Sequence, residues 1–372
     1  MDYINVNEPL LNGNEKKYLI ECIDTGWISS EGPFVKKFEQ IFSESVGRKF
    51  GVAVCNGTAA LEAAVIAAGI KNGDEVIMPA FTIISCASAV IRAGGIPVLV
   101  DSEIDTWNMS VPQIKKKITN RTKAIMAVHI YGLPVDMDPL IEISKEYNLI
   151  IIEDAAELIG QTYKGKPCGS FGEVSTFSFY PNKHITTGEG GMIVTDDEEI
   201  AERCRSLRNL CFKPGKRFEH DEMGFNFRMT NLQAAVGVAQ FERMDEFIKK
   251  KRDTGKMYNE LLKDIKGIQI PLESTPFAEN IYWVYGILIK DNKKGNAFDA
   301  MKKLNEKKIG TRPFFYPMHL QPVFRKMGLF KDESYPVSEK ISESGFYIPS
   351  GLGLTEEQIV RTSKEVRNLF GD

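Results

Sequence analysis

Short apolar runs alternate with amphipathic segments along the first two thirds of the chain. The runs are rich in Ile and Val and lie at residues 75–79, 96–101, 123–132, 149–154, 174–180 and 191–196. Runs of this kind, bounded by Gly, Pro or Asp, are typical of strands that are buried on both faces. Helical patterns such as LEAAVIAAG and MDPLIEISKEYN lie between them. This alternation predicts βαβ units, and therefore an α/β fold with a mainly parallel sheet flanked by helices.

The pattern changes after Arg243. A charged helical run over residues 244–253 is followed by irregular strands between residues 281 and 289 and by a last helix at residues 355–370. This order predicts a long helix that leads into a smaller C-terminal α+β domain. We therefore expect a large α/β domain over residues 1–243, which includes the N-terminal segment, and a small domain over residues 244–372.

The length and the net charge of the chain narrow the class of protein. The chain has 372 residues and a formal net charge of -3, with no long run of one sign, so it lacks the charge pattern of a nucleic-acid or membrane-surface protein. Its first residues lack the apolar core of a signal peptide, and no apolar stretch is long enough to span a bilayer. We therefore expect a cytoplasmic protein with no nucleic-acid or membrane partner.

Cysteine usage gives no sign of a disulfide framework or a metal centre. The six cysteines are scattered without a C-x-x-C pair, and only four histidines accompany them. We expect free, mostly buried thiols in a reducing compartment and no bound metal. A catalytic cysteine is the alternative, but no neighbouring residue supports it.

The stretch CNGTAALEAAVIAAG, residues 55–69, predicts a turn followed by a helix. Thr58 is a good N-cap, and Gly69 is placed to end the helix. A helix that begins at a glycine-containing turn presents free backbone N–H groups and the positive end of its dipole, which can bind a phosphate. A plain helix cap explains the same residues, so this segment alone leaves both interpretations open.

The stretch LIIIEDAAELIG, residues 149–160, places Glu153 and Asp154 directly after four apolar residues. An acid therefore lies at the carboxyl end of a buried strand, where open α/β sheets bind their ligands. An unpaired buried carboxylate is costly, so Asp154 needs a cationic or N–H partner. A structural ion pair or a helix N-cap would meet this need, and so would a protonated heterocyclic nitrogen.

Lys183 lies between an aromatic strand that contains Ser178 and the glycine-rich turn at residues 188–191. A lysine in a partly desolvated site has a lowered pKa and can act as a nucleophilic amine toward an aldehyde. A surface lysine extending from a loop is the alternative, and the glycines could form only a hairpin turn. A phosphate cradle, a strand-end acid and an amine nucleophile are together the three fixtures that pyridoxal phosphate requires.

At these residues the sequence resembles the sugar aminotransferases of the DegT/DnrJ/EryC1/StrS family, which are pyridoxal phosphate enzymes of fold type I. The likeness covers essentially the whole chain. It is carried by WISSEGPFVKKFE, NGTAAL, GDEVIMPAFT, AVHIYG, IIEDAAE, SFYPNKHITTGEGGMIVTDD, GFNFRMTNLQAAVGVAQ and TRPFFYPMH. Four segments, WISSEG, NKHITTGEGG, MTNLQAAVGVAQ and TRPFFYPMH, are most similar to the branch that aminates C4 of a GDP-linked 4-keto-6-deoxy sugar.

The resemblance implies roles for the residues around the cofactor. Lys183 would bind the cofactor's aldehyde and move the proton between cofactor and substrate. Asp154 would pair with the pyridine N–H, and Glu157 would lie near the ring hydroxyl. The phosphate would be held by Gly57, Thr58, Ala59 and Ser178. Asn226 would reach the phosphate of the other subunit, which implies a homodimer with shared active sites.

The resemblance also implies a substrate side, formed by Arg312, Tyr316 and His319, with arginine contacting the diphosphate. Each of these features has a structural alternative. The loop over residues 312–319 could be a packed loop with two fixed prolines, and the segment over residues 226–228 could cap the next helix. The aromatic residues at 282, 283 and 285 could be core side chains instead of a base-stacking platform.

One position departs from the family pattern. Members usually have an aromatic residue after the threonine of the PAFT segment, where it stacks on the cofactor ring, but here Ile83 follows Thr82. Two arrangements are open: the aliphatic side chain covers the ring, or the neighbouring Phe81 takes part.

The resemblance implies transfer of an amino group from L-glutamate to C4 of a nucleotide-linked keto sugar for a surface polysaccharide such as the O-antigen of lipopolysaccharide. We expect GDP-4-keto-6-deoxymannose, and a UDP- or dTDP-linked keto sugar aminated at C3 or C4 is the alternative. Some members replace the lysine by histidine and act as 3-dehydratases, but Lys183 is kept here beside His184. A cofactor-binding regulator would need an added DNA-binding module, for which the chain has no spare length. A purely structural protein of the same fold would take up no cofactor.

Overall fold

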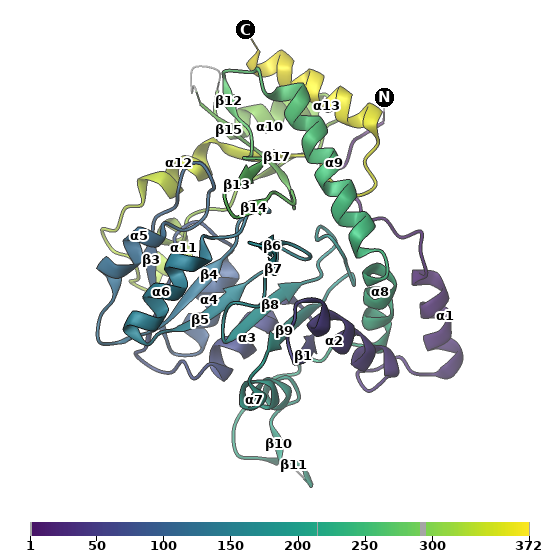
Figure 1. The fold of residues 1–372 in the computed structure, drawn as a ribbon, viewed down its shortest axis with the longest axis vertical. Helices are drawn as coiled ribbons and strands as arrows, with labels where there is room; N and C mark the ends of the chain where they lie inside the picture. Colours follow the sequence, from purple (N-terminus) through teal and green to yellow (C-terminus); the bar gives the residue numbers. More distant parts are fainter. Residues whose placement is uncertain (1, 214, 291–294, 372) are drawn as a thin grey trace.

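The structure is a computed structural model that describes residues 2–213, 215–290 and 295–371. Its centre is a seven-stranded sheet with the order β1-β9-β8-β5-β4-β2-β3 (Figure 1). The strands are β1 (Phe50–Val54), β2 (Glu75–Pro79), β3 (Ile96–Val100), β4 (Thr122–Val128), β5 (Ile150–Asp154), β8 (Val174–Ser178) and β9 (Gly191–Thr195). Strand β9 pairs antiparallel with both of its neighbours, and the other pairings are parallel. The mainly parallel sheet is confirmed, and each of the six apolar runs forms one of its strands.

Helices cover both faces of this sheet because successive strand residues point to opposite sides. In β2, Val76 and Met78 belong to one core cluster and Ile77 to the other. The first cluster lies under α3 (Gly57–Ala67), α4 (Ile84–Arg92) and α7 (Glu198–Arg208). The second lies under α2 (Pro33–Ser45), α6 (Met137–Tyr147) and α8 (Asn231–Phe241), and α1 (Glu15–Thr25) packs along α8.

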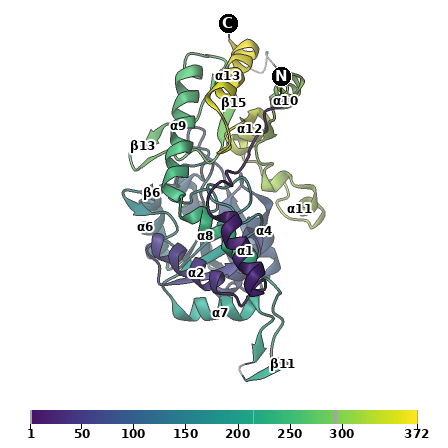
Figure 2. The ribbon, with the colours of Figure 1, turned by 90° about the vertical axis from the view of Figure 1, so that its right-hand side faces the viewer.

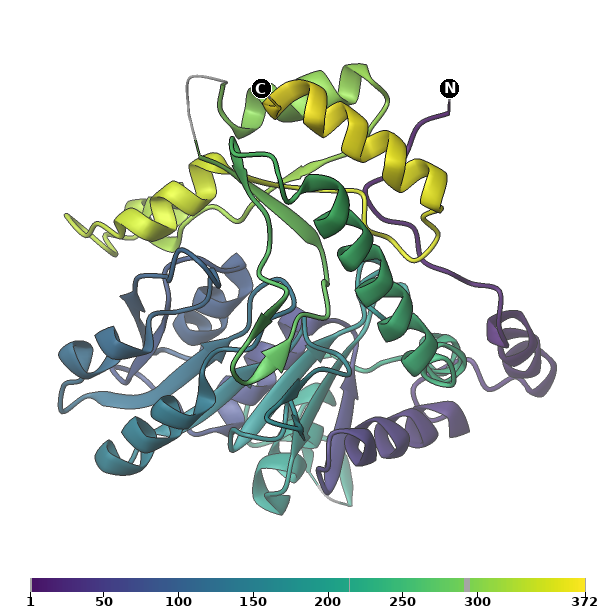
Figure 3. The same cartoon turned by 45° about the horizontal axis from the view of Figure 1, so that its top comes forward.

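The C-terminal part begins with the long helix α9 (Met244–Leu262) and builds a second sheet (Figure 3). This sheet is antiparallel with the order β12-β15-β17-β16, formed by β12 (Ile268–Gln269), β15 (Tyr285–Ile289), β16 (Arg312–Pro313) and β17 (Gly345–Ile348). Its helices are α10 (Ala297–Glu306), α11 (Pro322–Lys326), α12 (Pro336–Ser344) and α13 (Glu356–Phe370). A third core cluster joins this sheet to α9 and α13. The α+β character of the C-terminal part is confirmed.

The chain start lies against the C-terminal part, because Ile4 pairs with Ile309 and its carbonyl accepts the Gly310 N–H at 2.8 Å. The division into domains over residues 1–243 and 244–372 stays a prediction.

The remaining elements are short. They are α5 (Val111–Ile114), the 3-10 helices at Lys115–Lys117 and Met318–Leu320, and the small pairs β6 (Thr162–Tyr163) with β7 (Lys166–Pro167), β10 (Phe212–Lys213) with β11 (Lys216–His220), and β13 (Ser274–Thr275) with β14 (Ala278–Glu279). The β10–β11 hairpin projects from the body of the molecule (Figure 2). All six cysteines lie in the described ranges and are free, five of them buried. Across those ranges, no helix combines the length and the apolar character needed to cross a membrane.

Candidate active site

A cavity of about 710 Å³ opens at the carboxyl ends of β4, β5 and β8 and at the start of α3. In this sheet β5 lies between β4 and β8, with Asp154 in register with Val128 and Thr176. Most of the residues expected around the cofactor line the cavity: Gly57, Thr58, Ala59, Asp154, Glu157, Ser178 and Lys183. Segments far apart in the sequence therefore meet at the sheet edge where α/β folds bind ligands.

The phosphate side of the cavity is the first turn of α3. The N-cap is Asn56, whose side chain accepts the Ala59 N–H at 2.8 Å, so the expectation that Thr58 caps this helix is wrong. Asn56 has the extended backbone of a cap, and the helix begins one residue before Thr58. Thr58 is free to hydrogen-bond Ser85 through the two hydroxyls at 2.9 Å. The helix start that lines the cavity offers N–H groups and the positive dipole end to an anion.

Gly57 brings this helix close to β8. A Cβ atom at Gly57 would lie 2.8 Å from the Cβ of Ser178. Glycine is therefore required for the helix start and the end of β8 to approach each other, and both line the same corner of the cavity. That corner is a cradle for a small anion.

Asp154 ends β5 and is almost fully buried. Its Oδ1 accepts the Ala156 N–H at 3.1 Å, and the thiol of Cys86 donates to Oδ2 at 3.3 Å. Burial raises the pKa of Asp154, and these two hydrogen bonds only partly oppose that effect. The buried carboxyl group therefore needs one more partner, and a protonated ring nitrogen in the cavity would supply the missing charge.

The neighbouring carboxylate, Glu153, lies outside the cavity lining and anchors the strand end. It accepts hydrogen bonds from Gly169 N–H at 2.5 Å, Phe171 N–H at 3.0 Å, Gly172 N–H at 3.4 Å, the Ser175 hydroxyl at 3.2 Å and His129 Nε2 at 3.0 Å. Burial alone would raise the pKa of Glu153, but the hydrogen bonds outweigh it and hold the pKa below its usual value. Glu153 is therefore a charged structural centre beside Asp154.

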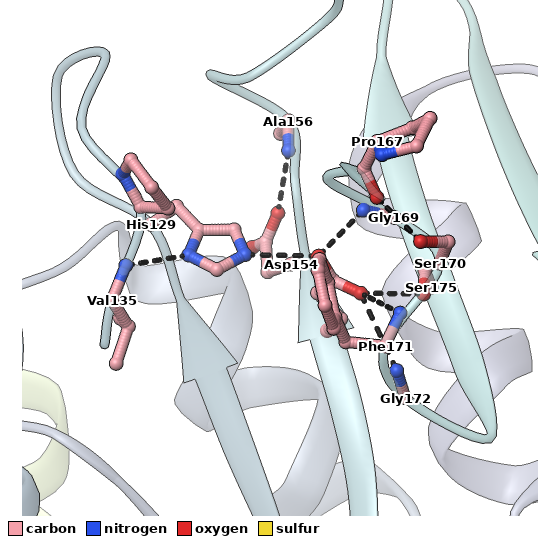
Figure 4. Close-up of polar contacts among 12 residues, drawn as sticks. His129, Val135, Asp154, Ala156, Pro167, Gly169, Ser170, Phe171, Gly172 and Ser175 are labelled. Atoms are coloured by element: carbon pink, nitrogen blue, oxygen red, sulfur yellow. Dashed lines mark hydrogen bonds and ion pairs between the residues drawn. The ribbon is translucent and has the colours of Figure 1, made fainter. Parts of the chain in front are cut away.

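His129 has a defined tautomer in this network (Figure 4). Its Nδ1 lies 3.0 Å from the Val135 N–H and must accept that hydrogen, so the proton of the neutral ring is on Nε2, facing Glu153. The His129 N–H also donates to the Asp154 carbonyl at 3.2 Å, and the residue lines the cavity. His129 therefore ties the end of β4 to the end of β5 at the edge of the cavity.

Lys183 follows β8 and lines the same cavity. Its side chain is only 9% exposed, with Nζ 4.0 Å from Glu157 Oε1 and 3.8 Å from the centroid of the Trp283 ring. Burial lowers the pKa of Lys183 although Glu157 and Asp154 oppose this, and burial raises the pKa of Glu157 to about 8. Both shifts favour the uncharged amine that a nucleophile requires.

The four remaining expected residues lie outside the lining of this cavity. Asn226 is exposed and its Oδ1 accepts from Arg228 Nε at 2.9 Å. Neither residue caps α8, since Thr230 caps this helix in a capping box with Gln233. Arg312 and Tyr316 are exposed, and both belong to the segment that begins at β16.

His319 differs from its neighbours because it is fully buried. Its Nε2 lies 2.9 Å from a carboxylate oxygen of Glu339, and its ring packs edge-on against Tyr335. In this conformation the imidazole holds the loop against α12 and does not face the cavity.

Two side chains were open candidates for covering a bound ring. Phe81 is fully buried and packs against Tyr131, Phe314 and Phe315, whereas Ile83 is 41% exposed and lines the cavity. The aliphatic side chain, and not Phe81, is therefore the one that faces a ligand here.

Some residues of the site were missed from the sequence. His129 lines the cavity and Cys86 contacts Asp154 from α4. Both stand in or next to segments that were singled out, and their places after β4 and within α4 were the available signal. From the sequence, Trp283 fits a core aromatic or a base-stacking aromatic, and nothing near it in the sequence indicates a contact with Lys183. Within the described ranges, no group of three or more metal-ligating side chains gathers.

An anion cradle, a buried acid awaiting a cationic partner and a nearly buried amine fit pyridoxal phosphate, and a mainly parallel sheet that presents them together is the arrangement of fold type I enzymes. Residues 9–367 match the DegT/DnrJ/EryC1/StrS aminotransferase family, and the chain belongs to it. It is accordingly a pyridoxal phosphate-dependent aminotransferase.

Relatives match the chain over its whole length. It is 41% identical over 372 residues to a GDP-perosamine synthase of Escherichia coli O157:H7, covering 100% of both chains. It is also 41% identical over 367 residues to a GDP-perosamine synthase of Vibrio cholerae, covering 99% of both. Among solved structures, S. venezuelae DesV in complex with a ketimine intermediate superimposes with a TM-score of 0.89 at 30% identity, covering 96% of this chain and 95% of that one.

Proposed function

We propose that this enzyme transfers an amino group from L-glutamate to C4 of GDP-4-keto-6-deoxymannose and so forms GDP-perosamine for a surface polysaccharide. The observation that carries the proposal is the 41% identity, over the full length of both chains, to the GDP-perosamine synthase of Escherichia coli O157:H7. The site is consistent with it, since Glu157 occupies the cavity beside Lys183, as the resemblance implies.

The residues of the cavity take separate roles in this proposal. When bound, pyridoxal phosphate supplies an aldehyde that accepts the amino group and a ring that takes up negative charge. Lys183 is the catalytic amine and moves a proton at Nζ, while Asp154 holds the ring nitrogen in its protonated form. Glu157 would lie near the ring hydroxyl, and Ile83 would cover the ring face. The phosphate would be held by Gly57, Thr58, Ala59 and Ser178.

The nucleotide sugar enters from the side of the C-terminal part. Arg312 is exposed near the cavity wall formed by Phe315 and Tyr347, and its guanidinium suits a diphosphate. Tyr316 is 51% exposed and suits the sugar or the base. We assign to His319, buried against Glu339, the task of holding this loop in place for the substrate.

We propose a homodimer as the active unit. Asn226 and Arg228 hydrogen-bond to each other and lie outside the lining of the cavity of their own chain, although Phe227 between them belongs to it. We propose that the exposed amide of Asn226 meets the phosphate bound in a second copy. Exposed apolar side chains on α1 and just after it, namely Ile20, Ile23, Trp27 and Ile28, offer surface for the same contact.

The test is the absorbance of the protein loaded with pyridoxal phosphate. L-Glutamate should remove the yellow absorbance and release 2-oxoglutarate, and GDP-4-keto-6-deoxymannose should then restore it. Lys183→Ala should take up the cofactor without this cycle, and Lys183→His should lack net amino transfer. Restoration by a UDP- or dTDP-linked keto sugar, with no response to the GDP sugar, would reject the proposed substrate but keep the aminotransferase.

A further inference from the structure

The segment over residues 281–283 lies alongside the segment that carries the catalytic lysine. The Trp283 indole N–H donates to the Asn182 carbonyl at 2.8 Å, and His184 Nε2 lies 3.4 Å from the Ile281 carbonyl oxygen. Between these two contacts, Nζ of Lys183 lies over the Trp283 ring, 3.8 Å from its centroid. The lysine is therefore bracketed on both sides by one short segment from the C-terminal part.

Trp283 is itself fixed. It is 4% exposed, its ring packs on Tyr131 with centroids 5.7 Å apart, and its indole N–H is used by Asn182. From α9, the ammonium of Lys251 donates to the Trp283 carbonyl at 2.7 Å and to the Ser350 carbonyl at 2.5 Å. Because Lys251 is 2% exposed, these carbonyls replace the water that its charge has lost. Lys251 thus fixes the backbone of Trp283, and the indole cannot turn away without losing its hydrogen bond to Asn182 and its contact with Tyr131.

We propose that Trp283 is a positioning residue for the reacting amine: its indole face holds Nζ of Lys183 over the cavity whenever the amine is free, and Lys251 anchors the Trp283 backbone from behind. This inference rests on the proposed role of Lys183. It adds a residue from a distant segment to the reaction machinery and gives the buried Lys251 a task in the same site.

The physical basis is the charge of the amine. An aromatic face attracts a cation, most strongly for tryptophan, and the attraction grows when the cation is shielded from water. Other groups facing Nζ are Glu157 and Asp154, which favour the charged amine, and burial, which disfavours it. The neighbouring His184 is buried, and burial lowers its pKa to about 3, so it adds no charge near neutral pH. Trp283 thus keeps the protonated amine accessible at a site that must release and recover a proton.

The test measures the titration of Lys183 in the protein without cofactor. Competitive labelling with acetic anhydride across a pH series, read by mass spectrometry of the peptide, gives the midpoint at which this amine becomes reactive. Trp283→Leu should lower the midpoint by about one pH unit, from a cation–π attraction of roughly 0.5–2 kcal/mol at 1.36 kcal/mol per unit. Trp283→Phe should give a smaller shift in the same direction, because a weaker aromatic face remains.

A matched control is Tyr282→Phe, which keeps an aromatic ring one residue away and removes only the hydroxyl that Asn259 contacts. Its midpoint should equal that of the parent protein. Equal midpoints for the parent, Trp283→Leu and Trp283→Phe would overturn the inference, as would equal shifts for Leu and Phe. If the Leu variant does not fold, an unchanged midpoint in Trp283→Phe overturns it alone.

A second measurement separates this inference from the proposed function. Borohydride reduction of the loaded protein should fix pyridoxal phosphate on Lys183. Cofactor fixed on another lysine overturns the proposed function and the positioning role with it. Cofactor on Lys183 together with an unchanged midpoint in both Trp283 variants overturns the positioning role alone.

Discussion

Glu153→Gln should destabilise the protein strongly, although it removes only a charge and keeps the shape of the side chain. In the structure, Glu153 Oε1 accepts from His129 and Gly169, and Oε2 accepts from Phe171, Gly172 and Ser175. All of these contacts are shielded from water, because Glu153 is 0% exposed. Glutamine keeps one accepting oxygen and turns an NH₂ group toward the other donors.

The magnitude follows from the donors that lose their acceptor. The Ser175 hydroxyl can rotate to a new partner, but the N–H groups of Phe171 and Gly172 are fixed by the backbone. A buried donor left without a partner costs about 1–3 kcal/mol, and breaking a buried charged network costs about 3–5 kcal/mol. We therefore expect a loss of about 3–5 kcal/mol in the free energy of unfolding.

Urea unfolding, followed by circular dichroism, measures this loss as a lower midpoint at an unchanged slope. The control is Glu146→Gln, which removes a charge from an exposed pair with Lys115, where the carboxylate is 51% exposed. The control should unfold like the parent, since exposed pairs contribute little. A loss under about 1 kcal/mol for Glu153→Gln would refute the claim that this network holds the strand end.

The sign of the pH dependence follows from the pKa of Glu153, which is lower in the folded protein than its ordinary value of 4.5. The contribution of its charge is fully present above that ordinary value and is lost as the pH falls through the lower folded value. The stability difference between the parent and Glu153→Gln should therefore stay constant near neutral pH and shrink below about pH 4.5.

Three further substitutions test other contacts. Gly57→Ala should weaken pyridoxal phosphate binding by about tenfold or more in an absorbance titration, while the circular dichroism spectrum stays unchanged. The new Cβ would lie 2.8 Å from the Cβ of Ser178 and must displace the Ser178 side chain. Cys86→Ala should weaken the same binding by about two- to tenfold and Cys86→Ser should not, because only serine still donates to Asp154. Gly255→Ala in α9 should lower the free energy of unfolding by about 1–3 kcal/mol in thermal unfolding, because the new Cβ would lie 2.3 Å from the Tyr282 ring. Helix propensity alone would favour alanine, so the sign of the effect tests this contact.

Much of the fold was predictable because strands buried on both faces leave continuous apolar runs. Strand β1, with the short sequence FGVAV, was missed because five residues with a glycine give little periodicity. The place of β9 between β1 and β8 was also beyond the sequence, since strand order depends on contacts between distant segments. The error at Thr58 has a local cause: Asn56 and Thr58 both suit an N-cap, and the extended backbone of Asn56 decides between them.

The cofactor side of the site was more predictable than its walls. Asp154 and Lys183 sit at strand ends, where the pattern of the chain itself marks the ligand-binding edge. His319 could not be judged in the same way, because its burial depends on Glu339 and Tyr335, which a loop and a helix bring to it. The role of Trp283 could not be predicted either, since the sequence does not distinguish an aromatic residue that fills a core from one that faces an amine.

The two buried lysines show why burial alone does not identify a reactive amine. Lys251 is the more deeply buried, and burial lowers its pKa to about 7, so a search for desolvated lysines would select it as readily as Lys183. Its ammonium is occupied by two backbone carbonyls, whereas Nζ of Lys183 faces a cavity, a carboxyl group 4.0 Å away and an aromatic ring. A lysine can react only where space for an aldehyde adjoins its nitrogen. We therefore propose Lys183, and not Lys251, as the reactive amine, with Lys251 anchoring the wall behind it.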